Sequence, residues 1–244
     1  MSGRRYDDPG RERVQFQAMI DRMAREFIDR ISSLLDEPAE LVPRSSASDD
    51  HPAMVFLETA RQELEHLGFR AIGDFEPAPD DGEDPGERFC RFLLSDDGAV
   101  VVQLLRAPGD GDEPPVEAVM LSSRFGGGSS VTTARGYPAR VPEAPQFQDF
   151  HVDDTLPLDR VVRMHRLHVA ARGCSPVPFA SAADVLAHLK QQGEVTRQWR
   201  QAQGVHFYEL LLRRASGEHY DESVAHVVES IRAHPGWLKR GAAA

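Results

Sequence analysis

Two short polar turns in the middle of the chain constrain the fold more than any other feature. Asp96-Asp97-Gly98 separates two apolar runs, and an Asp-Gly step in that position is a strong hairpin signal because the turn needs positive φ. Gly126-Gly127-Gly128 separates a second pair of runs. Adjacent hairpins with short connections predict an antiparallel sheet of four to five strands. The predicted strands are 69–75, 88–95, 99–106, 117–124 and 129–135.

Helical periodicity lies on both sides of these strands. Large apolar residues recur there at spacings of three and four, which places them on one helix face. The order of helices, then a strand meander, then helices is typical of α+β proteins, because parallel α/β sheets alternate the two. We expect an α+β fold in which N-terminal and C-terminal helices flank the antiparallel sheet and cover one of its faces. The predicted helices are 10–36, 52–67, 158–172, 181–193 and a last one that starts at Asp221 or Ser223 and stops at Pro235.

A polar segment separates the first helix from the rest of the chain. Residues 37–50 contain two prolines, a serine-rich stretch and a closing acidic pair, a composition typical of a linker. The length of 244 residues suits one domain with an appendage. The predicted organisation is therefore a long amphipathic helix plus linker in residues 1–45 and a single α+β domain in residues 46–244.

The formal net charge of −11 argues against nucleic acid and anionic membranes as partners, unless a local patch overrides the total. The charge is uneven, with nine basic and four acidic residues between Leu156 and Ser216. Two interpretations stay open: a basic face for an acidic partner, or complementarity between two parts of the same protein.

Several absences favour a cytoplasmic, bacterial-type protein. Cys90 and Cys174 are too few for a secreted disulfide framework or a zinc cluster, and each is expected to be a free thiol. Cys90 is expected inside a strand and Cys174 in a loop after a helix. The N-terminus has no apolar core of a secretory signal, and no apolar run approaches the roughly 20 residues of a membrane helix.

The sequence contains no residues that can be assigned a catalytic, cofactor-binding or metal-binding role. His165 and His168 stand three apart on a predicted helix, and Asp153 lies nearby, but two histidines alone leave zinc short of its usual ligand number. We interpret His165 as a core or interface histidine. The Gly126-Gly127-Gly128 stretch lacks the lysine of a phosphate-binding loop. No serine or cysteine stands in a recognisable nucleophile motif.

The strongest functional candidate is the apolar stripe of the first helix. Such a stripe is costly to expose, so the helix is expected to dock on its own domain, a second copy or another protein. The sequence favours a non-enzymatic accessory or interaction protein without cofactor, with a protein partner or a homodimer. The alternative is a small-molecule-binding protein or hydrolase with a pocket between the sheet and the C-terminal helices. The predicted docking residues are Phe16, Ile20, Met23, Phe27, Ile31 and Leu34.

Overall fold

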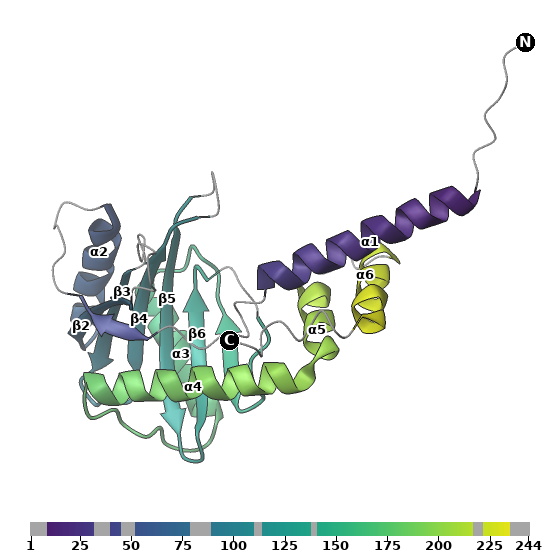
Figure 1. The fold of residues 1–244 in the computed structure, drawn as a ribbon. Coiled ribbons are helices and arrows are strands. Elements are labelled where there is room, and N and C mark those ends of the chain that lie inside the picture. The colour runs from purple at the N-terminus through teal and green to yellow at the C-terminus, as the bar shows by residue number, and fades with distance from the viewer. Residues whose placement is uncertain are drawn as a thin grey trace, which may run out of the picture. The chain divides into compact units, whose positions relative to one another are not determined.

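The computed structural model divides the chain into two compact units (Figure 1). The sheet unit comprises residues 38–139 and 143–194, and the helical unit comprises residues 1–37, 140–142 and 195–244. The part of the chain that the structure describes contains six helices and seven strands, which confirms the α+β class. The described segments are residues 9–31, 40–44, 52–78, 89–109, 114–137, 141–216 and 222–234.

All seven strands form one sheet in which neighbours along the chain are also neighbours in space. Every pairing is antiparallel except the last, in which β7 runs parallel to β6. The sheet is thus larger than the four to five strands predicted, and it is mixed rather than wholly antiparallel. The strands are β1 (Leu41–Pro43), β2 (Phe69–Pro77), β3 (Phe89–Ser95), β4 (Val101–Ala107), β5 (Val116–Phe125), β6 (Ser129–Arg135) and β7 (Phe147–His151).

The two strands that the sequence does not predict are the short edges of the sheet. β1 has three residues and lies inside the segment 37–50, where prolines and serines mask any alternating pattern. β7 follows a connection formed by residues 136–146. A parallel pairing needs a crossover of about a dozen residues, and this connection is just long enough to bring the chain back beside β6.

The hairpin between β3 and β4 forms as predicted. Gly98 has a φ of 70°, and its amide donates to the Ser95 carbonyl oxygen at 2.8 Å. The Asp97 carboxylate accepts from the Ser95 hydroxyl at 2.7 Å and from the Ala99 amide at 3.0 Å. The turn therefore satisfies its own polar groups. Gly126-Gly127-Gly128 likewise forms the tip between β5 and β6.

Replacing Gly98 should cost more than replacing a glycine with similar backbone angles in open space. A Cβ at Gly98 would lie 2.9 Å from the Phe179 carbonyl oxygen, whereas a Cβ at Gly127, with a φ of 78°, would meet nothing within 4 Å. Gly127→Ala carries conformational strain alone, about 1 kcal/mol. Gly98→Ala adds a backbone clash and should lower the free energy of unfolding by about 2–3 kcal/mol. Urea unfolding of both variants measures the difference, and equal losses would contradict the close approach of residue 179.

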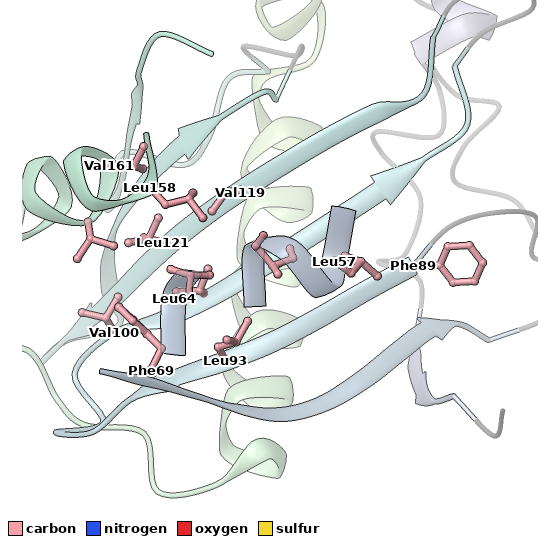
Figure 2. Packing of buried hydrophobic residues seen from close by; sticks show 14 of the residues in the cluster. Leu57, Leu64, Phe69, Phe89, Leu93, Val100, Val119, Leu121, Leu158 and Val161 are labelled. Carbon is pink, nitrogen blue, oxygen red and sulfur yellow. The ribbon is translucent and has the colours of Figure 1, made fainter. Parts of the chain in front are cut away.

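One face of the sheet packs against two helices, α2 (Pro52–His66) and α3 (Leu158–Ala171). Figure 2 shows this layer, with α2 lying over the strands. Its centre is apolar and fully buried, so the two helices are held by the hydrophobic effect. The residues at its centre include Leu57, Leu64, Phe69, Leu93, Val102, Leu121 and Val161.

The opposite face packs against α4 (Ala182–Gln203) through residues of the sheet unit. All seven residues of β3 are buried, because alternate side chains point into the two apolar layers. The expectation that helices cover only one face is therefore wrong. Both predicted cysteine environments are confirmed: Cys90 is buried in β3, and Cys174 is exposed after α3. The residues of this second layer include Phe75, Cys90, Phe92, Leu94, Phe179 and Val185.

The helical unit is built from α1 (Pro9–Ile31), α5 (Val205–Ser216) and α6 (Glu222–Ala233). The Ser230 hydroxyl of α6 donates to the Asp21 carboxylate of α1 at 2.7 Å, and this bond fixes one helix against the other. The predicted helix 10–36 is seen from residue 9 to residue 31, and residues 32–39 lie outside the described part. The apolar core of the unit contains Ile20, Ala24, Ile28, Phe207, Tyr208, Leu211, Val227 and Ile231.

Candidate functional site

The structure divides the predicted docking residues of α1 into two groups. Ile20 is 2% exposed and lies in the core of the helical unit. Phe27 is partly buried there, with its ring edge-on to Tyr208 at 6.3 Å. Phe16 and Met23 are exposed. Ile31 ends α1 with a side chain outside the described residues, and Leu34 also lies outside them.

Three exposed residues form a stripe along α1, which we call the exposed stripe: Phe16, Met19 and Met23. Their exposed fractions lie between 41% and 45%. Met19 is not among the predicted docking residues, although it stands four residues before Met23 and three after Phe16, the spacing of a common helix face. The apolar surface of α1 is therefore wider than the line of buried residues that contacts α5 and α6.

The exposed stripe lies beside the buried line rather than opposite it. Successive residues are about 100° apart around a helix, so Met23 lies about 100° from Ala24. Val14, which is 70% exposed, stands elsewhere on the circumference. The Phe16 ring is edge-on to His226 of α6 at 5.5 Å, so one end of the stripe borders the helix pair. A second helix laid on the stripe would extend the core of the helical unit.

A second polar cluster lies under α3 and contains both candidate histidines. His165 is fully buried, and its Nε2 lies 3.0 Å from the Ser123 hydroxyl of β5. Its Nδ1 lies 3.1 Å from the Thr133 hydroxyl of β6. The same hydroxyl lies 2.9 Å from Nδ1 of His168, whose ring stacks on Phe150 at 3.8 Å.

The protons of this cluster can be assigned from the donors and acceptors available. Ser123 donates its one hydroxyl hydrogen to the Ala99 carbonyl oxygen at 2.8 Å, so His165 Nε2 must donate to Ser123. A neutral imidazole then has Nδ1 as an acceptor, and Thr133 donates to it. Thr133 in turn accepts from Nδ1 of His168. Each hydrogen donated within this row of hydrogen bonds, from Ala99 to His168, therefore has an acceptor.

This arrangement suits a structural role better than catalysis. A serine beside a histidine resembles an activated nucleophile, but here both residues are buried and the serine hydrogen is directed to a carbonyl. Burial, then the nearby His168 and Arg166, lowers the pKa of His165 from 6.5 to about 3. The imidazole is therefore neutral at physiological pH. The interpretation of His165 as a core histidine is confirmed.

The other candidate residues named from the sequence, Asp153 and Cys90, form no hydrogen bond with His165 or His168. Asp153 accepts from the amide and the hydroxyl of Thr155, at 2.8 and 2.6 Å, so it caps a turn. The Gln103 amide donates to the Cys90 sulfur at 3.3 Å, and burial raises the pKa of that thiol. Within the described segments no group of three or more His, Cys, Asp or Glu side chains could hold a metal ion.

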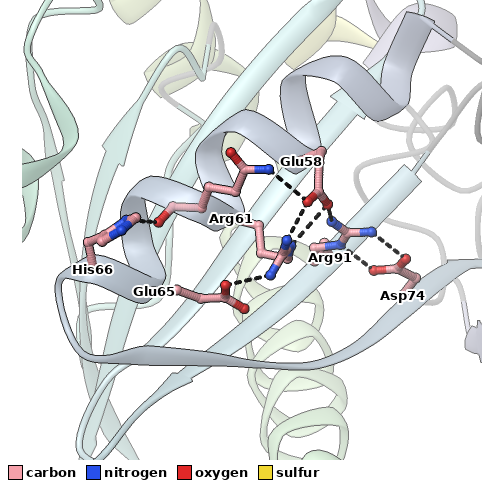
Figure 3. A network of polar contacts seen from close by, with 7 residues as sticks. Glu58, Arg61, Glu65, His66, Asp74 and Arg91 are labelled. Atoms are coloured by element: carbon pink, nitrogen blue, oxygen red, sulfur yellow. Dashed lines mark hydrogen bonds and ion pairs between the residues drawn. The ribbon is translucent and has the colours of Figure 1, made fainter.

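A charged network that sequence analysis missed joins α2 to the sheet (Figure 3). Arg91 of β3 donates two hydrogen bonds to the Asp74 carboxylate, at 2.6 and 2.8 Å, and one to Glu58 of α2 at 3.0 Å. Arg61 also pairs with Glu58 and is the first cause of the fall in the Glu58 pKa to about 2. The signal in the sequence was an arginine inside the apolar run Phe89–Ser95, since a buried guanidinium needs a carboxylate.

A shallow depression of about 300 Å³ lies on the sheet unit between the end of α2 and α3. Leu67 and Val162 supply its apolar floor, and Asp159, Arg163 and Arg166 supply its polar lining. Its charged lining groups are one carboxylate and two guanidinium groups.

Comparisons with known proteins do not add a function to this geometry. Scans against protein-family models, curated proteins and solved structures gave no match. No helix in the described segments is long and apolar enough to cross a membrane. A functional hypothesis therefore has to come from the surfaces of the two units.

Proposed function

We propose that this chain is a non-enzymatic interaction protein and that it contacts a second copy of itself through the exposed stripe of α1. The observation that supports this proposal is the exposure of three large apolar side chains on a helix whose other face is already anchored. An apolar face of this kind is used in helix-to-helix docking, where side chains at helical spacing fill a partner's groove.

The stripe suits pairing with its own copy in an antiparallel arrangement. With Met19 at the centre, Phe16 of one helix would meet Met23 of the other, and two-fold symmetry would repeat that contact. Methionine sulfur packs favourably against aromatic rings. The Arg22–Glu26 pair of α1, 3.9 Å apart, places both charge signs on the helix, which limits repulsion between two copies of an acidic protein.

The association should be weak. Each stripe residue is already more than half buried. Burying the rest of its surface at a contact would therefore contribute about 1 kcal/mol per residue, or about 5–6 kcal/mol for both copies before the entropy of association is subtracted. We therefore expect a dimer that forms with increasing concentration rather than an obligate one.

Charge placed on the exposed stripe should abolish this association. Met19→Glu with Met23→Glu should give a monomer at every concentration, because carboxylates would be buried at the contact. Val14→Glu adds the same kind of charge elsewhere on α1 and should associate like the wild type. Sedimentation equilibrium over a wide concentration range measures the result, and circular dichroism checks that α1 is intact.

The opposite outcomes are equally clear. A wild-type chain that stays monomeric throughout the range would contradict self-association. Loss of the dimer in Val14→Glu would move the contact to another face of the helix. The full chain is needed here, because Ile20, Ala24 and Ile28 belong to the core of the helical unit and removing α1 would expose that core.

A further inference from the structure

The outer face of α3 carries several exposed arginines and few carboxylates. Elsewhere, Arg91 and Arg124 each make paired hydrogen bonds to one carboxylate. The side chains of Arg160 and Arg166 form no hydrogen bond or ion pair with another described residue. Arg163 has only a loose contact with Asp159, at 3.8 Å between exposed side chains.

This arrangement runs against the composition of the protein. The chain has 39 acidic residues against 28 arginines and lysines, so carboxylates outnumber the groups that could pair with them. Yet α3 carries three exposed arginines and one aspartate on its outer face. Of the two interpretations that the uneven charge left open, complementarity within the protein is weak on this face. The Ser95 hydroxyl is the first cause of the fall in the Asp97 pKa, and Arg166 adds to it through its charge, but without a hydrogen bond or ion pair.

Apolar surface lies directly beside these arginines. Arg163 and Arg166 line the same shallow depression as Leu67 and Val162, and its volume of about 300 Å³ suits one or two side chains. Leu167 is exposed on the same helix, four residues after Arg163. A ligand for this surface must therefore combine negative charge with an apolar group.

We propose that the arginine-lined depression between α2 and α3 binds an acidic peptide segment of another protein, which inserts an apolar side chain and places carboxylates on Arg163 and Arg166. Guanidinium groups match carboxylates in planar, two-point hydrogen bonds, and charge complementarity would guide the encounter with an otherwise acidic protein. The surface lies in the sheet unit, so the proposal does not depend on the exposed stripe of α1.

An acidic peptide fits this surface better than a nucleic acid does. α3 contains no Phe, Tyr or Trp on which bases could stack. An apolar floor also contributes nothing to phosphate binding.

Selection from a random peptide display library on the full-length protein tests the proposal. We expect enriched peptides with acidic residues around a large apolar residue. Titration of one enriched, labelled peptide should give binding that weakens with added salt. Arg163→Glu with Arg166→Glu should weaken that binding about tenfold or more, since each loses a charge-assisted contact. Lys190→Glu makes the same charge change per site at an exposed position of α4 and serves as the matched control.

Four results would overturn the proposal. The library could yield no enriched peptide, or its peptides could bind the doubly reversed variant as tightly as the wild type. A labelled oligonucleotide could bind in the same salt and lose affinity in the same variant, which would indicate a nucleic acid instead. Self-association lost in this variant but kept in Met19→Glu with Met23→Glu would show that the segment belongs to a second copy.

Discussion

Replacing Arg91 by methionine should lower the free energy of unfolding by about 3 kcal/mol, because two carboxylates would lose a shared buried partner. The Arg91 side chain is only 9% exposed, and it spans from Asp74 of β2 to Glu58 of α2. Removing one member of such a network leaves charges that the protein interior solvates poorly. The estimate stays at the low end of the range because Asp74 and Glu58 are 34% and 42% exposed and water can reach them.

Arg61 is the matched control for this effect. It binds the same Glu58 and also pairs with Glu65, but its side chain is 26% exposed, against 9% for Arg91. Arg61→Met should therefore cost clearly less stability than Arg91→Met, because ion pairs that water can reach contribute less. Urea unfolding followed by circular dichroism compares the two variants. A loss in Arg61→Met as large as that in Arg91→Met would mean that burial does not set the strength of the network.

A second substitution separates the loss of the ion pair from the loss of packing. Asp74→Asn in the Arg91→Met background removes the stranded charge, so the double variant should be more stable than the sum of the two single losses predicts. Simple additivity would contradict a direct interaction between Arg91 and Asp74. Arg91→Lys should fall between the wild type and methionine, because an ammonium keeps the charge without the two-point geometry.

The parts of the fold that were predictable from sequence depend on local signals. The turn at Asp97-Gly98 needs a residue with positive φ between two apolar runs, and glycine supplies it. The β3–β4 hairpin could therefore be placed within a residue or two. The helix from Leu158 ends where Gly173 adopts a φ of 68°, as its sequence predicts. Such features are set by backbone conformation within a few residues, which is the information that a single sequence carries.

The parts that failed depend on contacts distant in sequence. The sequence predicts that a helix ends at Gly193, but α4 continues through this residue to Gln203, because one internal glycine costs only about 1 kcal/mol. Strand β7 forms because the chain returns to lie beside β6, and no local sequence pattern indicates that pairing. For the same reason, the three residues of β1 are a strand only because β2 is beside them.

The candidate sites show the same division. The amphipathic character of α1 was visible in its spacing, but the sequence could not show which apolar residues α5 and α6 would cover. It therefore joined buried Ile20 with exposed Met23 and omitted Met19. The partners of His165 are 42 and 32 residues away in sequence, at Ser123 and Thr133, so its hydrogen bonds could not be foreseen from spacing.

The buried histidine should make this protein lose stability as the pH falls from neutral. The folded state holds the pKa of His165 at about 3, against 6.5 for an ordinary histidine, because burial disfavours the cation. At pH values between these two pKa values, His165 binds a proton in the unfolded chain but stays neutral in the folded protein. Stability from this residue is therefore complete above about pH 6.5 and falls toward acid, by about 2 kcal/mol at pH 5.

His165→Leu should cross the wild type when stability is plotted against pH. At neutral pH the variant should be less stable by about 1–2 kcal/mol, because the Thr133 hydroxyl loses its acceptor in a buried site. At pH 5 the wild type has lost about 2 kcal/mol through His165, whereas leucine has nothing to protonate. The two curves should therefore meet near pH 5, with the variant becoming the more stable protein below it.

His165→Gln separates titration from hydrogen bonding. Glutamine can accept from Thr133 and donate to Ser123, so this variant should keep more of its neutral-pH stability than leucine does and should also resist acid. His168, whose pKa burial also lowers, is present in all three proteins and so contributes a similar acid dependence to each. Urea unfolding at a series of pH values measures the three curves. Parallel curves would show that His165 is protonated as easily in the folded protein as in the unfolded chain. That result would contradict the prediction that burial disfavours the His165 cation.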